Sequence, residues 1–253
     1  MSQGIVVTGA GDSVGRVIAE RFLERGLKVH IADLRPEAVE STLAENPGMT
    51  GVVANIGHPK DVDALFDTAR QAFADLVALV NCVGVGGPRG LTEDLDAADW
   101  KATFDVNVHG ILYTMQKAIP WMKRAGQGAI VNFSSASTRT RLPWRSAYIS
   151  SKFALEGLTL NAARELGPHG IRCNAILPGI IDNQRMRTIM AARAEQEGRP
   201  LAEVEAAYTD YISMRSKVSP AELADAVLYL CSPAARMVTG ELMAVSGNLE
   251  WET

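Results

Sequence analysis

Short runs of β-branched and apolar residues alternate with longer helical patterns along almost the whole chain. Strands are expected at residues 4–8, 28–32, 50–54, 76–81, 128–133, 171–177 and 241–245, and helices at 15–25, 36–44, 60–73, 97–124, 146–166 and 220–232. Strands joined by crossover helices pair in parallel. The alternation therefore predicts an α/β fold, a doubly wound sheet of seven parallel strands with helices on both faces.

One stretch departs from this alternation. Residues 182–218 have no strand pattern, are rich in Arg, Glu and Ala, and are typical of two helices broken near 198–200. An insertion after the sixth strand lies over the carboxyl ends of the strands, where open α/β sheets bind ligands. We expect a small helical lid there. The chain shows no repeat, low-complexity tract or linker, so one domain is expected over residues 1–253.

Composition excludes several classes of protein. The net charge is −4, from 25 basic and 29 acidic residues, so a general nucleic-acid footprint is not expected. No apolar run approaches the roughly 20 residues of a membrane helix, and the N-terminus does not resemble a secretory signal. Three cysteines lack paired spacing and four histidines are scattered, which favours a cytoplasmic protein with free thiols and no metal site.

The first strand runs directly into a glycine-rich turn and a helix. Glycines allow a pyrophosphate to approach the backbone, and the free N–H groups of the helix start stabilise its charge. This context predicts a dinucleotide site, whose candidate contacts are Thr8, Gly9, Gly11, Asp12, Ser13, Val14 and Gly15. A tight strand-to-helix turn without a ligand is the alternative.

The second strand ends at Asp33, followed by Leu34. A carboxylate at this place accepts hydrogen bonds from an adenosine ribose and repels a 2′-phosphate, so NAD is favoured over NADP. Asp33 acting only as a cap of the next turn is the alternative, and Arg35 leaves some use of NADP open.

Tyr148 and Lys152 are four residues apart in a helical pattern and therefore share a face. Ser135 follows the fifth strand, at the same edge of the sheet as the glycine turn. A tyrosine is a poor base at neutral pH, because its unperturbed pKa is about 10, but a nearby ammonium favours the phenolate. The joint spacing predicts hydride-transfer chemistry with Tyr148 as the acid and base.

With these pieces the chain resembles the short-chain dehydrogenase/reductase family over essentially its whole length. The resemblance rests on the glycine turn, Asp33, Asn81-Cys82-Val83-Gly84, Asn107, Ser135, Tyr148, Lys152 and Pro178-Gly179. It implies a Rossmann-fold enzyme, homotetrameric or homodimeric, that oxidises an alcohol or reduces a ketone with a nicotinamide cofactor.

The resemblance also implies roles for single residues. Tyr148 is the acid/base, Ser135 orients the substrate, Lys152 binds the nicotinamide ribose and tunes Tyr148, and Asn107 holds a water that links Lys152 to solvent. Further cofactor contacts are expected at Asn55, Ile56, Asn81, Val83, Gly84, Pro178, Gly179 and Ile181.

The chain departs from the family pattern at four places. Ser13 replaces the middle turn glycine, and Asn55-Ile56 stands where an Asp usually meets the adenine amino group. Cys82-Val83 replaces Asn-Ala, and Asn183 replaces the threonine that meets the carboxamide.

The loop between Ser135 and Tyr148 is rich in arginine. Arg139, Arg141 and Arg145, with Ser137 and Trp144, are candidate substrate contacts, and Arg89 lies in another rim loop. Guanidinium groups match carboxylates, sulfonates and phosphates, which favours an anionic substrate. Solvated or intersubunit arginines are the alternative, in which case Trp144, Leu142, Met186 and Tyr208 would suit a neutral alcohol.

The sequence thus predicts an NAD-dependent oxidoreductase for a small polar or anionic hydroxy or keto compound. An NADPH-dependent 3-oxoacyl-type ketoreductase and a non-catalytic dinucleotide sensor are the alternatives. Apolar stripes on the helices around 98–124 and 146–166 favour subunit contacts, with core burial as the competing explanation; the stripes comprise Ile111, Leu112, Met115, Phe153, Leu155 and Leu158.

Overall fold

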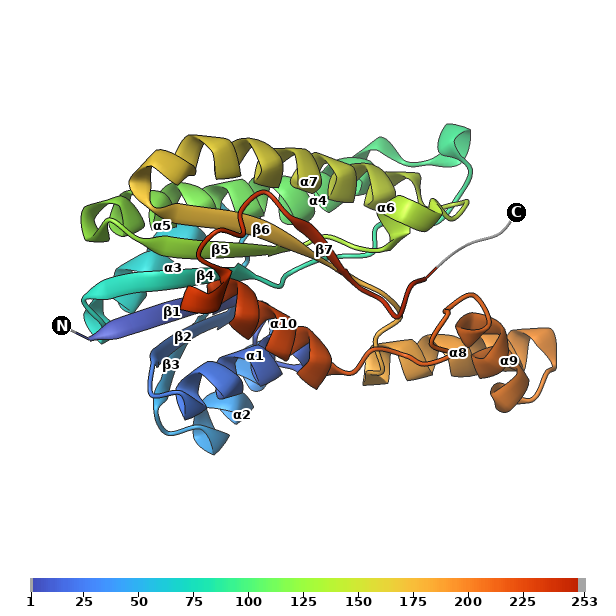
Figure 1. Ribbon diagram of the computed structural model, residues 1–253. Helices are drawn as coiled ribbons and strands as arrows, with labels where there is room; N and C mark the ends of the chain where they lie inside the picture. The colour runs from blue at the N-terminus through green and yellow to red at the C-terminus, as the bar shows by residue number, and fades with distance from the viewer. Residues whose placement is uncertain (1, 250–253) are drawn as a thin grey trace.

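The computed structural model describes residues 2–249, and the seven strands of this part of the chain form one sheet (Figure 1). The sheet order is β3-β2-β1-β4-β5-β6-β7, and every neighbouring pair is parallel. The strands are β1 (Gln3–Thr8), β2 (Lys28–Asp33), β3 (Met49–Val53), β4 (Asp75–Asn81), β5 (Gly128–Phe133), β6 (Ile171–Pro178) and β7 (Leu242–Val245). The predicted doubly wound parallel sheet is confirmed.

Helices cover both faces of the sheet (Figure 1). One face carries α1 (Ser13–Glu24), α2 (Pro36–Glu45) and α10 (Pro220–Cys231). The other carries α3 (Pro59–Ala72), α4 (Ala97–Phe104), α5 (Ile111–Ala125) and α7 (Ser146–Leu166). Short elements are α6 (Ser137–Thr140) and 3-10 turns at Thr92–Asp94, Gly167–His169 and Pro233–Ala235. None of the helices in residues 2–249 has the length and apolar character of a membrane span.

Both faces of the sheet are buried under helices, which explains why the strand sequences are continuous apolar runs. In β1, Ile5 and Val7 pack with Ile18 of α1, whereas Val6 packs into the core on the opposite side of the sheet. Successive side chains of a strand point to opposite faces, so a sheet covered twice needs apolar residues at every position. The carboxyl ends of the strands remain free to build a site.

The segment between residues 97 and 125 is not the uninterrupted α-helical pattern that the sequence suggests. A π-helical stretch, Asp105–Gly110, separates α4 from α5 and contains the buried Asn107. Gly110 ends this stretch where a Cβ would stand 2.8 Å from the Ile56 carbonyl oxygen, which ties it closely to the loop after β3. Such π-helical insertions widen a helix locally and often occur at functional positions.

The insertion after β6 contains two helices, as expected. They are α8 (Gln184–Glu197) and α9 (Leu201–Thr209), separated where Gly198 adopts φ 62° and ends α8. The pair projects from the body of the molecule beside the carboxyl ends of the strands (Figure 1). Its base is closed by a bridge between Ile181 and Val218, and a small cluster of Met190, Ala194 and Val204 packs within it. We call residues 182–218 the lid.

The apolar stripes of α5 and α7 are mostly core. Ile111, Met115 and Leu155 are 0–1% exposed and pack on the sheet, so the interpretation of these three as subunit contacts was wrong. Phe153 and Leu160 on α7 are instead 43% and 45% exposed.

Candidate active site

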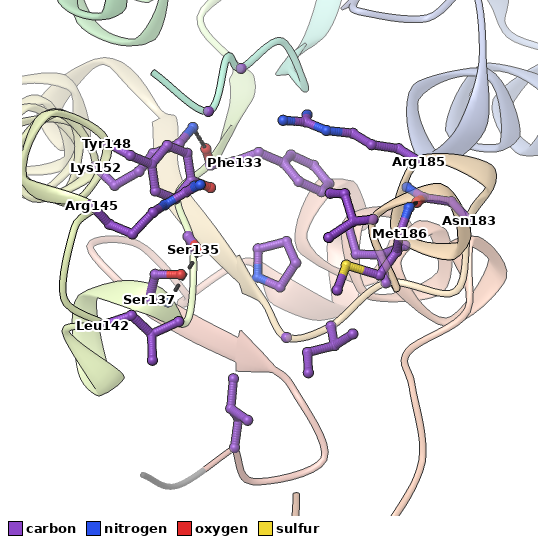
Figure 2. A pocket seen from close by; sticks show the side chains of 18 of the residues that line it. Phe133, Ser135, Ser137, Leu142, Arg145, Tyr148, Lys152, Asn183, Arg185 and Met186 are labelled. Carbon is purple, nitrogen blue, oxygen red and sulfur yellow. Dashed lines mark hydrogen bonds between the residues drawn. The ribbon is translucent and has the colours of Figure 1, made fainter. Parts of the chain in front are cut away.

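A cavity of about 690 Å³ opens at the carboxyl ends of the strands, between α7 and the lid. Figure 2 shows Arg145, Tyr148 and Lys152 on one side of it and Asn183, Arg185 and Met186 on the other. Many residues predicted from sequence line it: Gly9, Asp12, Ser13, Val14, Gly15, Gly84, Ser135, Ser137, Trp144, Arg145, Tyr148, Lys152, Pro178, Gly179 and Ile181. The topology therefore brings segments from both halves of the chain to one place.

The glycine turn after β1 is packed too closely for side chains. A Cβ on Gly15 would stand 2.1 Å from the Gly9 carbonyl oxygen, and Gly9 itself has φ 66°. Ser13 at the start of α1 has φ 50°, the left-handed conformation that favours glycine. Asn183 of the lid donates a 3.2 Å hydrogen bond from Nδ2 to Ser13 Oγ, which joins the lid to this turn. A turn shaped in this way fits a pyrophosphate at the start of α1.

Asp33 lies at the end of β2 beside the same turn and is 8% exposed. Its Oδ2 accepts a 3.0 Å hydrogen bond from the Gly11 amide, and its Oδ1 accepts from the Arg35 amide at 3.1 Å and from Arg35 Nε at 3.3 Å. Arg35 also reaches Asp12. The carboxylate is thus fixed next to the glycine turn, where the sequence predicted the ribose contact.

Other predicted cofactor contacts lie outside the cavity lining. Thr8 is buried and Leu34 is 62% exposed. Asn55, which stands where the family usually has an Asp, accepts a 3.0 Å hydrogen bond from the Gly57 amide through its side-chain oxygen. Ile56 is buried in the core, and Val83 is partly buried and packs against it. Asn81 is a buried structural amide, which donates to Asn132 Oδ1 and accepts from Thr114, each at 2.9 Å.

Tyr148 and Lys152 share one face of α7 and point into the cavity (Figure 2). Lys152 is 2% exposed, its Nζ donates a 2.7 Å hydrogen bond to the Phe133 carbonyl, and Nζ lies 5.8 Å from the centre of the Tyr148 ring. Burial lowers the pKa of Lys152, and the Tyr148 phenol opposes that shift. Gly84 permits the close packing here, since a Cβ on it would stand 3.1 Å from Lys152 Nζ.

Asn107 ties the loop after β4 to α7. Its Oδ1 accepts from the Val85 amide at 2.8 Å, and its Nδ2 donates to the Val85 carbonyl at 2.9 Å and to Ser151 Oγ at 3.0 Å. Ser151 donates in turn to the Tyr148 carbonyl at 2.7 Å. Asn107 does not line the cavity, so the water-holding role implied by the family resemblance stays a prediction.

Ser135 follows β5 and is held by a network that sequence reasoning missed. The buried carboxylate of Glu156, one turn after Lys152 on α7, accepts 2.7 Å hydrogen bonds from the hydroxyls of Ser134 and Thr138. Ser135 lies between these two positions, and its Oγ accepts from the Ser137 amide at 3.1 Å. The one signal in the sequence is an acidic residue four positions after Lys152, on the same face of the helix.

The arginines of the loop between Ser135 and Tyr148 do not all point into the cavity. Arg145 lines the cavity, with Cζ 4.6 Å from the centre of the Tyr148 ring. Arg139 and Arg141 are exposed and outside the lining, and Arg139 turns toward Glu156 at 3.7 Å. The interpretation of Arg139 and Arg141 as cavity residues was therefore wrong. Arg185 of the lid, which sequence reasoning did not single out, lines the cavity opposite Arg145 (Figure 2).

Cys82 also lines the cavity, and burial raises the pKa of its thiol to about 12. The thiol is therefore neutral near physiological pH, and the thiolate is the form that reacts. Cys82 is a packing residue of the site.

Comparison with known proteins agrees with this geometry. A family model described as enoyl-(acyl carrier protein) reductase matches residues 9–249. The 7alpha-hydroxysteroid dehydrogenase of Escherichia coli K12 is 30% identical over 247 residues, which cover 96% of this chain and 92% of that protein. The chain belongs to the short-chain dehydrogenase/reductase family, whose members are oxidoreductases acting on alcohol and ketone groups.

Two solved structures extend the comparison. An NAD+-bound xylitol dehydrogenase has a TM-score of 0.89 and 25% identity, covering 97% of this chain and 98% of its own. A variant of actinorhodin polyketide ketoreductase with NADPH has a TM-score of 0.92 and 26% identity, covering 98% of this chain and 97% of its own. Structures of this fold therefore hold either nicotinamide dinucleotide.

Proposed function

We propose that this protein is an NAD-dependent oxidoreductase that interconverts a secondary alcohol and a ketone on a small polar or anionic hydroxy or keto compound. One observation carries the proposal. Ser135, Tyr148 and Lys152 line the same cavity as the glycine turn at the start of α1, so an acid/base group and a dinucleotide cradle share one site.

The residues that would hold the cofactor follow from this arrangement. The turn from Gly9 to Gly15 would hold the pyrophosphate, Asp33 the adenosine ribose, and Lys152 and Tyr148 the nicotinamide half. A bound nicotinamide supplies the hydride acceptor or donor for the reaction. The carboxylate of Asp33 supports NAD over NADP, because it repels a 2′-phosphate.

The protein side chains move the proton. In alcohol oxidation, the Tyr148 phenolate takes the hydroxyl proton as the C–H bond gives up its hydride, and in ketone reduction the phenol returns that proton to the new alkoxide. Lys152 supplies a positive charge beside this proton transfer, with Nζ 5.8 Å from the centre of the Tyr148 ring. The Ser135 hydroxyl donates a hydrogen bond to the substrate oxygen and holds it beside Tyr148.

The decisive experiment replaces Tyr148 by Phe and measures NADH formation with a panel of hydroxy acids and neutral secondary alcohols. We expect turnover to fall by about 10²- to 10⁴-fold while NADH binding, followed by fluorescence, stays nearly unchanged. Tyr229→Phe is the matched control, because it removes the same hydroxyl from an exposed site on α10. Full turnover by Tyr148→Phe would refute the mechanism, and NADH binding without turnover in the wild type would favour a sensor.

Measuring turnover with NADP in parallel with NAD tests the ketoreductase alternative. The similar ketoreductase structure that contains NADPH is the reason to test it. Preference for NADP would replace NAD in the proposal and leave the proton chemistry unchanged.

We further propose that the chain works in the cytoplasm as a homotetramer or homodimer, with residues 1–253 as one domain. Three free cysteines support a reducing compartment. Exposed Phe153 and Leu160 on α7 support a subunit contact on that helix.

A further inference from the structure

The cavity carries more positive charge than its own carboxylates can balance. Five cationic side chains line it, whereas Asp12 is the one acid among its described lining residues. The cations are Arg89, Arg145, Lys152, Arg185 and Arg193. Asp12 lies at the glycine turn and already pairs with Arg35. The one lining acid is thus paired outside this group of five cations.

Three of these arginines have no acidic partner among the described residues. Within residues 2–249, no carboxylate lies within salt-bridge distance of Arg89, Arg145 or Arg185. Arg193, which lines the same cavity, is by contrast paired with Glu197. The protein thus neutralises one cavity arginine and leaves three available.

The unpaired guanidiniums converge although they come from three separate segments. Arg89 lies in the loop after β4, Arg145 at the start of α7, and Arg185 in the first turn of α8. A Cβ built on Gly86 would stand 3.0 Å from Arg185 Nη2 and 3.7 Å from Arg145 Nη2. The glycine leaves room for two cations that approach from opposite sides of the cavity (Figure 2).

This arrangement is unfavourable without an anion. Burial and the like charges of Arg89 and Arg185 lower the pKa of Arg145. Like charges held in a partly desolvated cavity repel, and a guanidinium deprived of water needs a charged acceptor. Planar guanidinium groups bind carboxylates and other oxyanions through paired hydrogen bonds, so an anionic ligand would relieve both penalties.

We propose that Arg145, together with Arg89 and the lid residue Arg185, binds an anionic group of the substrate close to the reacting carbon. This inference rests on the proposed function and narrows its substrate to short hydroxy or keto acids, with carboxylate, sulfonate and phosphate as the shared chemistry. Arg145 lies over the ring of Tyr148, whose hydroxyl meets the reacting oxygen. The anionic group is therefore separated from that oxygen by only a few carbon atoms.

The first test measures binding without catalysis. Acetate, methanesulfonate and inorganic phosphate are titrated calorimetrically into the NADH-bound wild-type protein, with neutral acetamide as the uncharged probe. We expect saturable binding of at least one anion and none of acetamide. Arg145→Met and Arg185→Met should each weaken that binding by at least about tenfold, as expected for a lost charged hydrogen bond. Arg141→Gln is the matched control, because it removes an exposed arginine of the same loop that does not line the cavity.

The second test measures selectivity. 2-Hydroxybutyrate and 3-hydroxybutyrate are compared with their methyl esters, and we expect kcat/KM to favour the acids in the wild type. Arg145→Met should raise KM for the acids and reduce that preference by at least about tenfold, with NADH binding unchanged.

Three results would overturn the inference: no saturable anion binding in the wild type, equal anion binding by wild type and Arg145→Met, or anions that bind only to cofactor-free protein and compete with NADH. The last would assign these arginines to the cofactor phosphates. Failure of the proposed function looks different, because NADH would then not bind, or Tyr148→Phe would retain full turnover.

Discussion

Glu156 Oε1 accepts a 2.7 Å hydrogen bond from the hydroxyl of Ser134, the residue directly before Ser135. Glu156 belongs to α7, the helix that carries Tyr148 and Lys152. This hydrogen bond therefore links the end of β5, where Ser135 lies, to α7. The relative position of Ser135 and Tyr148 therefore depends on a buried carboxylate that does not line the cavity.

Glu156→Ala should consequently lower both stability and turnover. It removes the carboxylate that accepts from Ser134 and Thr138 and leaves their hydroxyls only the Lys152 carbonyl at 3.5 Å and the Ser135 carbonyl at 2.9 Å. The expected loss is about 1–3 kcal/mol in the free energy of unfolding. We expect kcat to fall while the Kd for NADH is unchanged, and Glu156→Gln to restore most of kcat because its amide oxygen still accepts. Glu165→Gln, on the exposed face of the same helix, is the control. Equal kcat losses in the Ala and Gln variants would contradict a positioning role.

Asp33 and Arg35 make the choice between NAD and NADP testable. Asp33→Ser removes the charge that repels a 2′-phosphate and leaves Arg35 with Asp12 as its one remaining carboxylate partner among the described residues. We expect the ratio of kcat/KM for NADP over NAD to rise by at least about tenfold. Adding Arg35→Leu should remove part of that gain. Glu37→Gln in the first turn of α2 controls for charge alone. An unchanged ratio in Asp33→Ser would show that another residue sets the preference.

His30 makes stability depend on pH. It is buried between Thr50 and Thr68, and burial lowers its pKa from 6.5 to about 4. The unfolded chain binds the proton more readily, so this contribution is complete above about pH 6.5 and is lost as pH falls toward 4.

The expected size of this loss is about 3 kcal/mol. The His30→Gln variant has no titrating group at this position. In chemical denaturation, the difference in free energy of unfolding between wild type and variant should therefore become smaller as pH falls from about 6.5 to 4. His169→Gln, at an exposed turn, should leave the wild-type pH profile intact. A difference independent of pH would show that His30 does not titrate in this range.

Gly15 and Gly167 should respond oppositely to alanine. A Cβ on Gly15 would stand 2.1 Å from the Gly9 carbonyl oxygen, so Gly15→Ala should displace the glycine turn and weaken NADH binding. Gly167 has open space around it and φ −50°, so Gly167→Ala should stabilise the fold by about 0.4–1 kcal/mol. Thermal unfolding and NADH titration of both variants check this pair. Wild-type affinity for NADH in Gly15→Ala would show that the turn is more pliable than its packing indicates.

The sheet could be predicted because its physics is local. Each strand is a short apolar run bounded by turn residues, and crossover helices leave parallel pairing as the natural arrangement. The π-helical stretch at Asp105–Gly110 could not be predicted, because no residue pattern distinguishes it from an α-helix. Gly110, which ends this stretch, packs closely against Ile56, and these two residues are far apart in the sequence.

For the site, the positions of the central residues could be predicted from the sequence, but the directions of the side chains could not. Ser135, Tyr148 and Lys152 followed from spacing, since strand ends and the following helix starts share one edge of a parallel sheet. Side-chain direction did not follow from spacing. Arg139 and Arg141 stand in the same loop as Arg145, yet α6 turns them away from the cavity, whereas Arg185 reaches it from a helix more than thirty residues later in the chain.

The bridge between Ile181 and Val218 holds the two ends of the lid together. The Asp182 amide donates to the Val218 carbonyl and the Val218 amide donates to the Ile180 carbonyl, each at 2.8 Å, so the chain leaves and re-enters the body at one point. A loop whose ends already meet can change length with little further entropy loss. The lid can therefore be replaced as a unit. A replacement segment of different length and composition at this junction would change which molecules reach Tyr148 and would leave the strand register of the sheet unchanged.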